Sequence, residues 1–118
     1  MRSKLGDKVR LQHILDAMLE VENYIGKAEF KDFESNSMMR FACIKQLEII
    51  GEASNHISEG IKSHFSNIEW AQIIGMRHVF VHEYFGVDTI LVWEIIKHDI
   101  PELKVKIVEI LKSIAKAY

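Results

Sequence analysis

Arg77, His78, His82 and Tyr84 lie in one short stretch of the chain and carry side chains that can do chemistry together. Their spacing is R-x4-H-x-Y, with a second histidine directly after the arginine. The stretch therefore holds a permanent cation, two imidazoles that titrate near neutral pH and a phenol that can be covalently modified. This concentration makes it the candidate catalytic site.

These groups are sufficient to cleave RNA without a metal ion. A neutral His82 can take the proton from a ribose 2′-hydroxyl, and a protonated partner can return a proton to the leaving 5′-oxygen. Arg77 can hold the phosphate and stabilise the charge that develops on its oxygens. An imidazole with a pKa near ~6.5 suits both proton transfers. For His78, a supporting role in orienting groups or contacting RNA and a purely structural role both stay open.

The spacing also bears on how many chains build the site. At ~100° per residue, Arg77 and Tyr84 project within about 20° of each other on a helix, but Arg77 and His82 are about 140° apart. One straight helix therefore cannot easily bring Arg77 and His82 to the same phosphate. Two copies of the helix facing each other across a two-fold axis would remove this difficulty, and symmetric dimers are the commonest oligomers. We therefore expect a homodimer with a shared cleft.

Each of these residues also has a plainer interpretation. Arg77 could form a surface or interface salt bridge with Glu83 or Asp88, because such pairs are common. His82 could be a core or interface histidine with its hydrogen bonds satisfied. Tyr84 could be an interfacial aromatic residue whose hydroxyl has a hydrogen-bond partner.

A metal site is a further alternative, because His78 and His82 have the i, i+4 spacing of zinc ligands on a helix. Two ligands are too few for such a site, and no cysteine or further histidine cluster accompanies them. We therefore expect neither a metal nor another cofactor.

The elements that carry these residues are predicted to be helical almost throughout. Apolar residues at 3/4 spacing predict a first helix that Asp7 caps and Gly26 ends, and a second over about residues 37–58 that ends before Gly60. A third helix, over about 67–84, carries the motif. Asp88 can cap a fourth, and the capping-box spacing from Asp99 predicts a separate last helix. The inner face of the second helix is predicted from its periodicity: Phe41, Ile44, Leu47, Ile50, Ala53 and Ile57.

The segment over residues 27–36 lacks this periodicity and is predicted to be a loop that buries Phe30 and Phe33. No run alternates apolar and polar residues for long enough to form a sheet. The expected fold class is all-α, an antiparallel up-and-down bundle of four to five helices, with residues 1–118 as a single domain.

Composition limits the environment and the partners. The net charge of −2 gives no overall attraction to nucleic acid, so RNA must bind locally or to a surface built from more than one chain. Cys43 is the single cysteine, so no intrachain disulfide can form, and a reducing cytoplasm fits best. No secretory signal or apolar run of ~18 residues is visible, so neither secretion nor a membrane partner is expected.

The motif and its surroundings together resemble the HepT toxins of the HEPN superfamily. Residues 47–53, LEIIGEA, look like a segment of that family, and the match runs over roughly residues 7–111. The family often has Asn directly after the motif arginine, where this chain has His78. Other matching positions lie outside the motif: Arg10, His13, Ile14, Leu15, residues 68–70, 75–77, 87–88 and Trp93.

This resemblance implies a function as well as a fold. HepT-like proteins are similar to metal-independent endoribonucleases that form homodimers with the motif at the interface. They pair with MntA, a minimal nucleotidyltransferase antitoxin that transfers AMP onto the motif tyrosine, which is Tyr84 in this chain. The implied function is the toxin of a type VII toxin–antitoxin system that cleaves RNA such as tRNA or mRNA.

Two other functions stay open at this point. HEPN domains also occur as non-catalytic binding or partner subunits of nucleotidyltransferases, and an intact motif does not prove turnover. The chain could also be a purely structural helical dimer that uses Arg77 for pairing at its interface. A neighbouring gene for a small nucleotidyltransferase would favour the first two functions over the third.

Overall fold

The chain folds into helices wherever the structure describes it. The computed structural model describes the backbone of residues 4–82 and 88–117 and the side chains of residues 6–76 and 88–116, and no strand occurs in these ranges. The all-α fold class is therefore confirmed. The elements follow in chain order: α1 (Lys4–Ile25), α2 (Phe30–Ser35), α3 (Ser37–Asn55), α4 (Glu59–His64), α5 (Trp70–His82), α6 (Thr89–Glu94), the π-helical segment η1 (Ile95–Asp99) and α7 (Ile100–Ala117).

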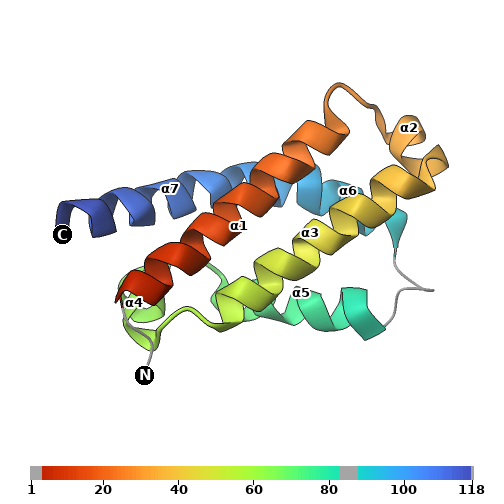
Figure 1. Ribbon diagram of the computed structural model, residues 1–118. Helices are drawn as coiled ribbons and strands as arrows, with labels where there is room; N and C mark the ends of the chain where they lie inside the picture. The colour runs from red at the N-terminus through yellow and green to blue at the C-terminus, as the bar shows by residue number, and fades with distance from the viewer. Residues whose placement is uncertain (1–3, 83–87, 118) are drawn as a thin grey trace.

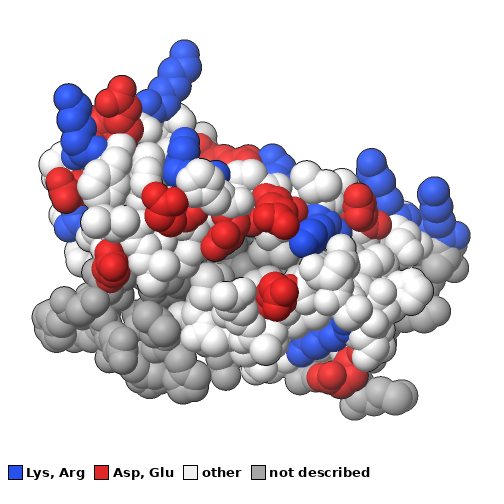
Figure 2. All heavy atoms as spheres, turned by 180° about the vertical axis from the view of Figure 1, so that it is seen from behind, with Lys and Arg blue, Asp and Glu red and all other residues white. Residues whose placement is uncertain are grey.

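The long helices run in alternating directions, as the up-and-down topology predicts (Figure 1). α3 contacts both α1 and α5, and α7 packs on the other side of α1. Charged side chains are spread over the face seen from behind (Figure 2). In the described part of the chain, no helix combines the length and the apolar character needed to cross a bilayer.

The core forms where the apolar stripes of these helices meet. In α1 the predicted stripe is buried at Leu11, Ile14, Met18 and Val21, each 0% exposed. The helix ends as predicted at Gly26, whose φ of +51° lies in the left-handed region that glycine adopts without a steric cost. In α3 the predicted inner face is buried at Leu47 and Ile50 but not at Phe41, which is 58% exposed. The prediction that Phe41 faces the core is therefore wrong.

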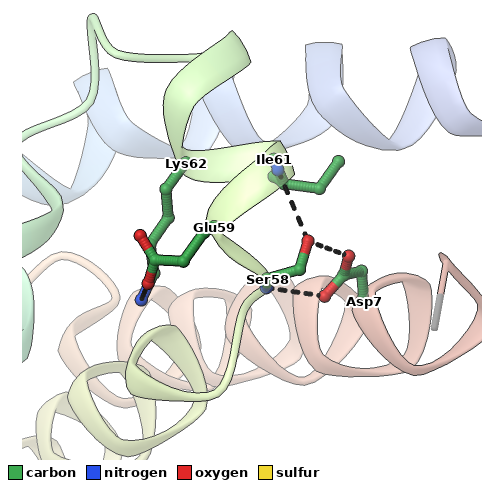
Figure 3. Close-up of polar contacts among 5 residues, drawn as sticks. All are labelled: Asp7, Ser58, Glu59, Ile61 and Lys62. Atoms are coloured by element: carbon green, nitrogen blue, oxygen red, sulfur yellow. Dashed lines mark hydrogen bonds and ion pairs between the residues drawn. The ribbon is translucent and has the colours of Figure 1, made fainter. Parts of the chain in front are cut away.

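Asp7 was predicted to cap α1, and this prediction is wrong, because α1 already begins at Lys4. Instead its buried carboxylate joins α1 to the start of α4 (Figure 3). The Ser58 backbone N–H donates to Asp7 Oδ1 at 2.9 Å, and the Ser58 hydroxyl donates to Oδ2 at 2.6 Å. The same hydroxyl oxygen accepts from the Ile61 N–H as the N-cap of α4. A buried polar link thus fixes two segments that are 51 residues apart.

Two short helices lie where none was predicted. The predicted loop over residues 27–36 contains α2, in which the Glu29 N–H donates to Asp32 Oδ2 at 2.9 Å. Phe33 is fully buried as expected. The predicted second helix ends at Asn55 instead of residue 58, and Gly60 lies inside α4 instead of ending a helix. Helices of six residues are too short to display a 3.6-residue period, so periodicity could not reveal them.

The predicted break between the last two helices is also wrong, because α6, η1 and α7 follow one another without interruption. Pro101 has no N–H to donate, and in a regular helix its ring would press against the carbonyl group of Lys97. The backbone widens into a π turn just before the proline, and the Ile100 N–H donates to the carbonyl oxygen of Ile95. The π turn lets the chain pass a proline without ending the helix.

Candidate active site

Helix α5 carries three of the four predicted site residues in its backbone. Arg77, His78 and His82 fall within Trp70–His82, so the prediction that the motif lies on a helix is confirmed for these positions. The side chains of these three residues and the whole of Tyr84 lie outside the described residues. Because positions 77 and 82 share one helix, their separation of about 140° around its axis follows from helical geometry.

The start of α5 is held in place by Trp70. Its ring is 7% exposed, and its Nε1–H donates to the carbonyl oxygen of Phe65 at 3.1 Å. Ile68, 4% exposed, packs into the same core, and Ile73 and Met76 lie partly buried against it. These contacts fix the direction of the helix for the two turns that lead up to Arg77.

The LEIIGEA segment lies on α3, the helix that contacts α5. Leu47, Ile50, Gly51 and Ser54 are buried at i, i+3, i+4 and i+7, which is one face of that helix. Because Gly51 on this buried face has no side chain, the backbone of α3 can come close to a neighbouring helix. The segment therefore supports the motif helix by packing.

Each of the two glutamates of that segment has a basic partner three or four residues away. Glu48 pairs with Lys45 at 3.8 Å, and Glu52 lies 3.0 Å from the Nε2 atom of His56. Both pairs join residues three or four apart at the surface, where ion pairs contribute little stability.

On the far side of the motif the chain is fixed again at α6. Asp88 caps this helix as predicted, and its Oδ1 atom accepts from the N–H groups of Ile90 at 2.9 Å and Leu91 at 3.2 Å. Trp93 packs between Phe30 and Phe33 of α2, with ring centroids 5.9 Å and 5.1 Å away. These contacts agree with a packing role for Trp93.

Two titratable side chains with shifted pKa values belong to helices other than α5. The pKa of Tyr24 on α1 is raised, mainly by its hydrogen bond to Glu20, and its hydroxyl also accepts a 3.3 Å hydrogen bond from Gln46. Burial raises the pKa of the Cys43 thiol on α3 to about 11. Neither group is therefore readily ionised at neutral pH.

A possible metal site can be examined only in part. In the residues whose side chains are described, no three His, Cys, Asp or Glu residues are grouped so that they could hold a metal ion. The side chains of His78 and His82 are outside that range, so the expectation that no metal binds there stays a prediction.

Known proteins resemble this chain over most of its length. A protein of Methanocaldococcus jannaschii named "Putative RNase MJ1380" is 40% identical over 109 residues, which cover 92% of this chain and 99% of that protein. The "Probable ribonuclease HepT" of Thermococcus cleftensis is 38% identical with the same coverage. The "Putative RNase TTE0752" of Caldanaerobacter subterraneus is 36% identical over 103 residues, 87% of this chain and 92% of that protein.

No solved structure matches the chain significantly. The family model described as "Ribonuclease HepT-like" matches residues 14–110, a range that includes α3, α5 and the whole motif. With this match and the relatives above, the chain belongs to the ribonuclease HepT-like family.

Proposed function

We propose that this protein is a metal-independent endoribonuclease and the toxin of a type VII toxin–antitoxin pair. The observation that carries the proposal is the HepT-like match over residues 14–110, with R-x4-H-x-Y intact inside it and Arg77 and His82 on one helix. The names of the relatives, which include RNase and ribonuclease HepT, support the same reaction. We propose that residues 1–118 act as one domain in the cytoplasm, where the free thiol of Cys43 stays reduced.

Arg77 and His82 have separate tasks in the reaction that we propose. His82 of one subunit takes the proton from a ribose 2′-hydroxyl, and the freed oxygen attacks the adjacent phosphorus. The bond from phosphorus to the 5′-oxygen breaks, and a protonated histidine donates a proton to that oxygen. The products are a 2′,3′-cyclic phosphate and a 5′-hydroxyl. Arg77 holds the phosphate and stabilises the negative charge on its oxygens as the bond breaks.

The proposed active form is a homodimer. Positions 77 and 82 are about 140° apart on α5, so an arginine and a histidine reach one phosphate more easily from two facing helices than from one. A two-fold axis beside α5 would create two such pairs. His78 would support the site by orienting a neighbouring group or by contacting RNA.

Control of the enzyme is proposed to act at Tyr84. A minimal nucleotidyltransferase of the MntA type would transfer AMP from ATP to the Tyr84 hydroxyl, with release of pyrophosphate. The product carries a bulky adenosine and a negative phosphodiester on a residue seven positions after Arg77 in the sequence. Negative charge at this position would compete with the RNA phosphate for the arginine.

The proposal is tested by incubating purified protein with total RNA in the presence of a chelator. We expect wild type to cut RNA and Arg77→Ala to lose activity by a factor on the order of 10²–10³, because a charge-stabilising contact is removed. The control is Lys104→Ala. It also removes one cation, but at the surface ion pair between Lys104 of α7 and Glu22 of α1. If wild type and Arg77→Ala are equally inert, the protein is instead a binding subunit without catalytic activity.

A further inference from the structure

A groove with a volume of about 360 Å³ separates α5 from the continuous helix α6–η1–α7. On the α5 side it is lined by Gln72, Ile73 and Met76 of that helix and by Glu69 directly before it, which follow one another at i, i+3, i+4 and i+7 from Glu69. The opposite side runs from Leu91 to Lys106 and includes residues of the π turn. Two helix stripes that face each other across an open groove form a concave surface, into which side chains of another helix lying over it could insert.

The floor of this groove is apolar and continues to its rim. Ile68, Ile95 and Ile100 line it and are between 1% and 6% exposed, so they form a closed floor. Leu91 also lines it but is 49% exposed. Exposed leucines are ordinary when they stand alone, but Leu91 extends an apolar surface that is already concave. An apolar side chain of a bound partner would cover Leu91, and removing this leucine from water would favour binding.

The rim of the groove is acidic. Glu69, Asp99 and Glu102 line it, and its one described cation, Lys106, already donates to Glu102 at 3.4 Å and to the carbonyl oxygen of Asn67 at 3.1 Å. Figure 2 shows acidic side chains across the middle of the rear face, with most lysine and arginine side chains nearer its edges. Such a rim repels RNA phosphates and attracts cations.

We propose that this groove docks a basic amphipathic helix of a partner protein. Apolar residues of that helix at i, i+3, i+4 and i+7 would fill the floor, and its lysine or arginine side chains would pair with the acidic rim. The π turn widens one wall of the groove, and π turns occur frequently at functional sites. Met76 links this surface to the motif helix, since Arg77 follows it directly. The docking site does not depend on RNA cleavage.

The test uses the full chain and a synthetic probe, a fluorescein-labelled helical peptide with leucine at i, i+3, i+4 and i+7 and lysine elsewhere. A second peptide has glutamate in place of every lysine. Leu91→Asn replaces an apolar side chain that lines the groove by an uncharged polar one. Val105→Asn is its control, because Val105 is 60% exposed on α7 and does not line the groove. Glu102→Lys reverses a rim charge, and Glu109→Lys makes the same change one heptad further along α7, outside the groove.

We expect anisotropy titrations to show binding of the lysine peptide, weakened about tenfold or more by Leu91→Asn and by Glu102→Lys, which is 1.4 kcal/mol or more. The two control variants should bind like wild type, the glutamate peptide should not bind, and added salt should weaken binding. Circular dichroism checks that each variant is folded. The proposal is overturned if the lysine peptide does not bind, or if groove and control variants weaken it equally. It is also overturned if Leu91→Asn abolishes self-association or RNA binding instead, because the groove would then serve a second copy or RNA.

Discussion

At the scale of single residues, the pKa of Tyr24 bears on which tyrosine could accept AMP in the proposed modification. A phenol that attacks a phosphorus must lose its proton, and the pKa of Tyr24 is raised by its hydrogen bond to Glu20. Its hydroxyl is also engaged by Gln46, which ties it to α3. Tyr24 is thus a poor candidate for the proposed modification. Of the two remaining tyrosines, Tyr84 and Tyr118, the place of Tyr84 in the motif favours it.

Tyr84→Phe is therefore expected to abolish modification while Tyr24→Phe leaves it unchanged. On co-expression with the nucleotidyltransferase, intact-mass spectrometry should show about 329 Da added per AMP on wild type and Tyr24→Phe, and no addition on Tyr84→Phe. Tyr84→Phe should keep most of its RNase activity, because a phenol with a pKa near ~10 is a poor base at neutral pH. An unchanged added mass on Tyr84→Phe would assign the acceptor to another residue.

Cys43 gives a second prediction at this scale. Burial raises the pKa of its thiol from 9.0 to about 11, so its thiolate is about 100-fold scarcer than that of an ordinary cysteine at pH 8. Alkylation by iodoacetamide at pH 8 should be slower by at least that factor in native protein than in urea, as measured by mass. A native thiol that reacts as fast as the unfolded one would show that Cys43 is accessible.

The same shift makes stability depend on pH. In the unfolded chain the thiol loses its proton near pH 9, whereas in the folded chain it keeps the proton until about pH 11. The unfolded state therefore binds fewer protons between these values, and the free energy of unfolding falls as pH rises through that window. Comparison with Cys43→Ala isolates this contribution, because the stability difference between the two proteins should be constant below pH 9 and change above it.

At the scale of elements, the sequence predicts long helices well and short or interrupted ones poorly. The stripe of α1 and the Asp88 cap of α6 are local patterns, and both were predicted correctly. The bond from Ser58 to Asp7 spans 51 residues, so no local pattern indicates it. The capping-box spacing from Asp99 predicts a separate last helix, because the π turn that carries the chain past Pro101 leaves no local signature in the sequence. For the site, the spacing of Arg77 and His82 predicts that both lie on one helix, which is confirmed. Which subunit would supply the arginine and which the histidine depends on contacts between chains, and no local sequence pattern indicates these.

The Asp7–Ser58 link should be measurable as stability. Ser58→Ala removes a 2.6 Å hydrogen bond to a buried carboxylate and the N-cap of α4 together, so we expect a loss of about 1–3 kcal/mol. Urea denaturation followed by circular dichroism measures it. Ser63→Ala, at an exposed position of the same helix, is the control and should change stability by less than about 0.5 kcal/mol. Equal losses in the two variants would mean that the buried link contributes nothing specific.

Gly75 offers a prediction about the motif helix itself. It lies inside α5, where glycine costs about 1 kcal/mol relative to alanine, and a Cβ atom added there would meet nothing within 4 Å. Gly75→Ala should therefore raise the free energy of unfolding by roughly 0.5–1 kcal/mol. If the same variant loses RNase activity while gaining stability, RNA or a second subunit approaches the backbone here. A loss of stability would mean that the space around position 75 is more crowded than the contacts within one chain indicate.

At the scale of the whole molecule, the central question is whether one chain can build the active site. Arg77 and His82 occupy one helix, α5, at positions that point about 140° apart. On a single α5, the proposed phosphate-binding position 77 and the proposed base position 82 therefore fall on different sides of the helix. A dimer with the two α5 helices facing each other would place the arginine of one subunit beside the histidine of its partner, and subunit exchange can distinguish these arrangements.

Arg77→Ala and His82→Ala should each be inactive alone but partly active when mixed. In a mixed dimer the Arg77→Ala subunit supplies an intact histidine and the His82→Ala subunit supplies an intact arginine, so one of two composite sites is complete. Random exchange makes half of the dimers mixed, and activity should return to about a quarter of wild type. Co-refolding the two variants at equal amounts and measuring RNA cleavage tests this. Recovery that rises with the fraction of mixed dimers supports a shared site, whereas no recovery despite proven exchange would assign arginine and histidine to the same subunit.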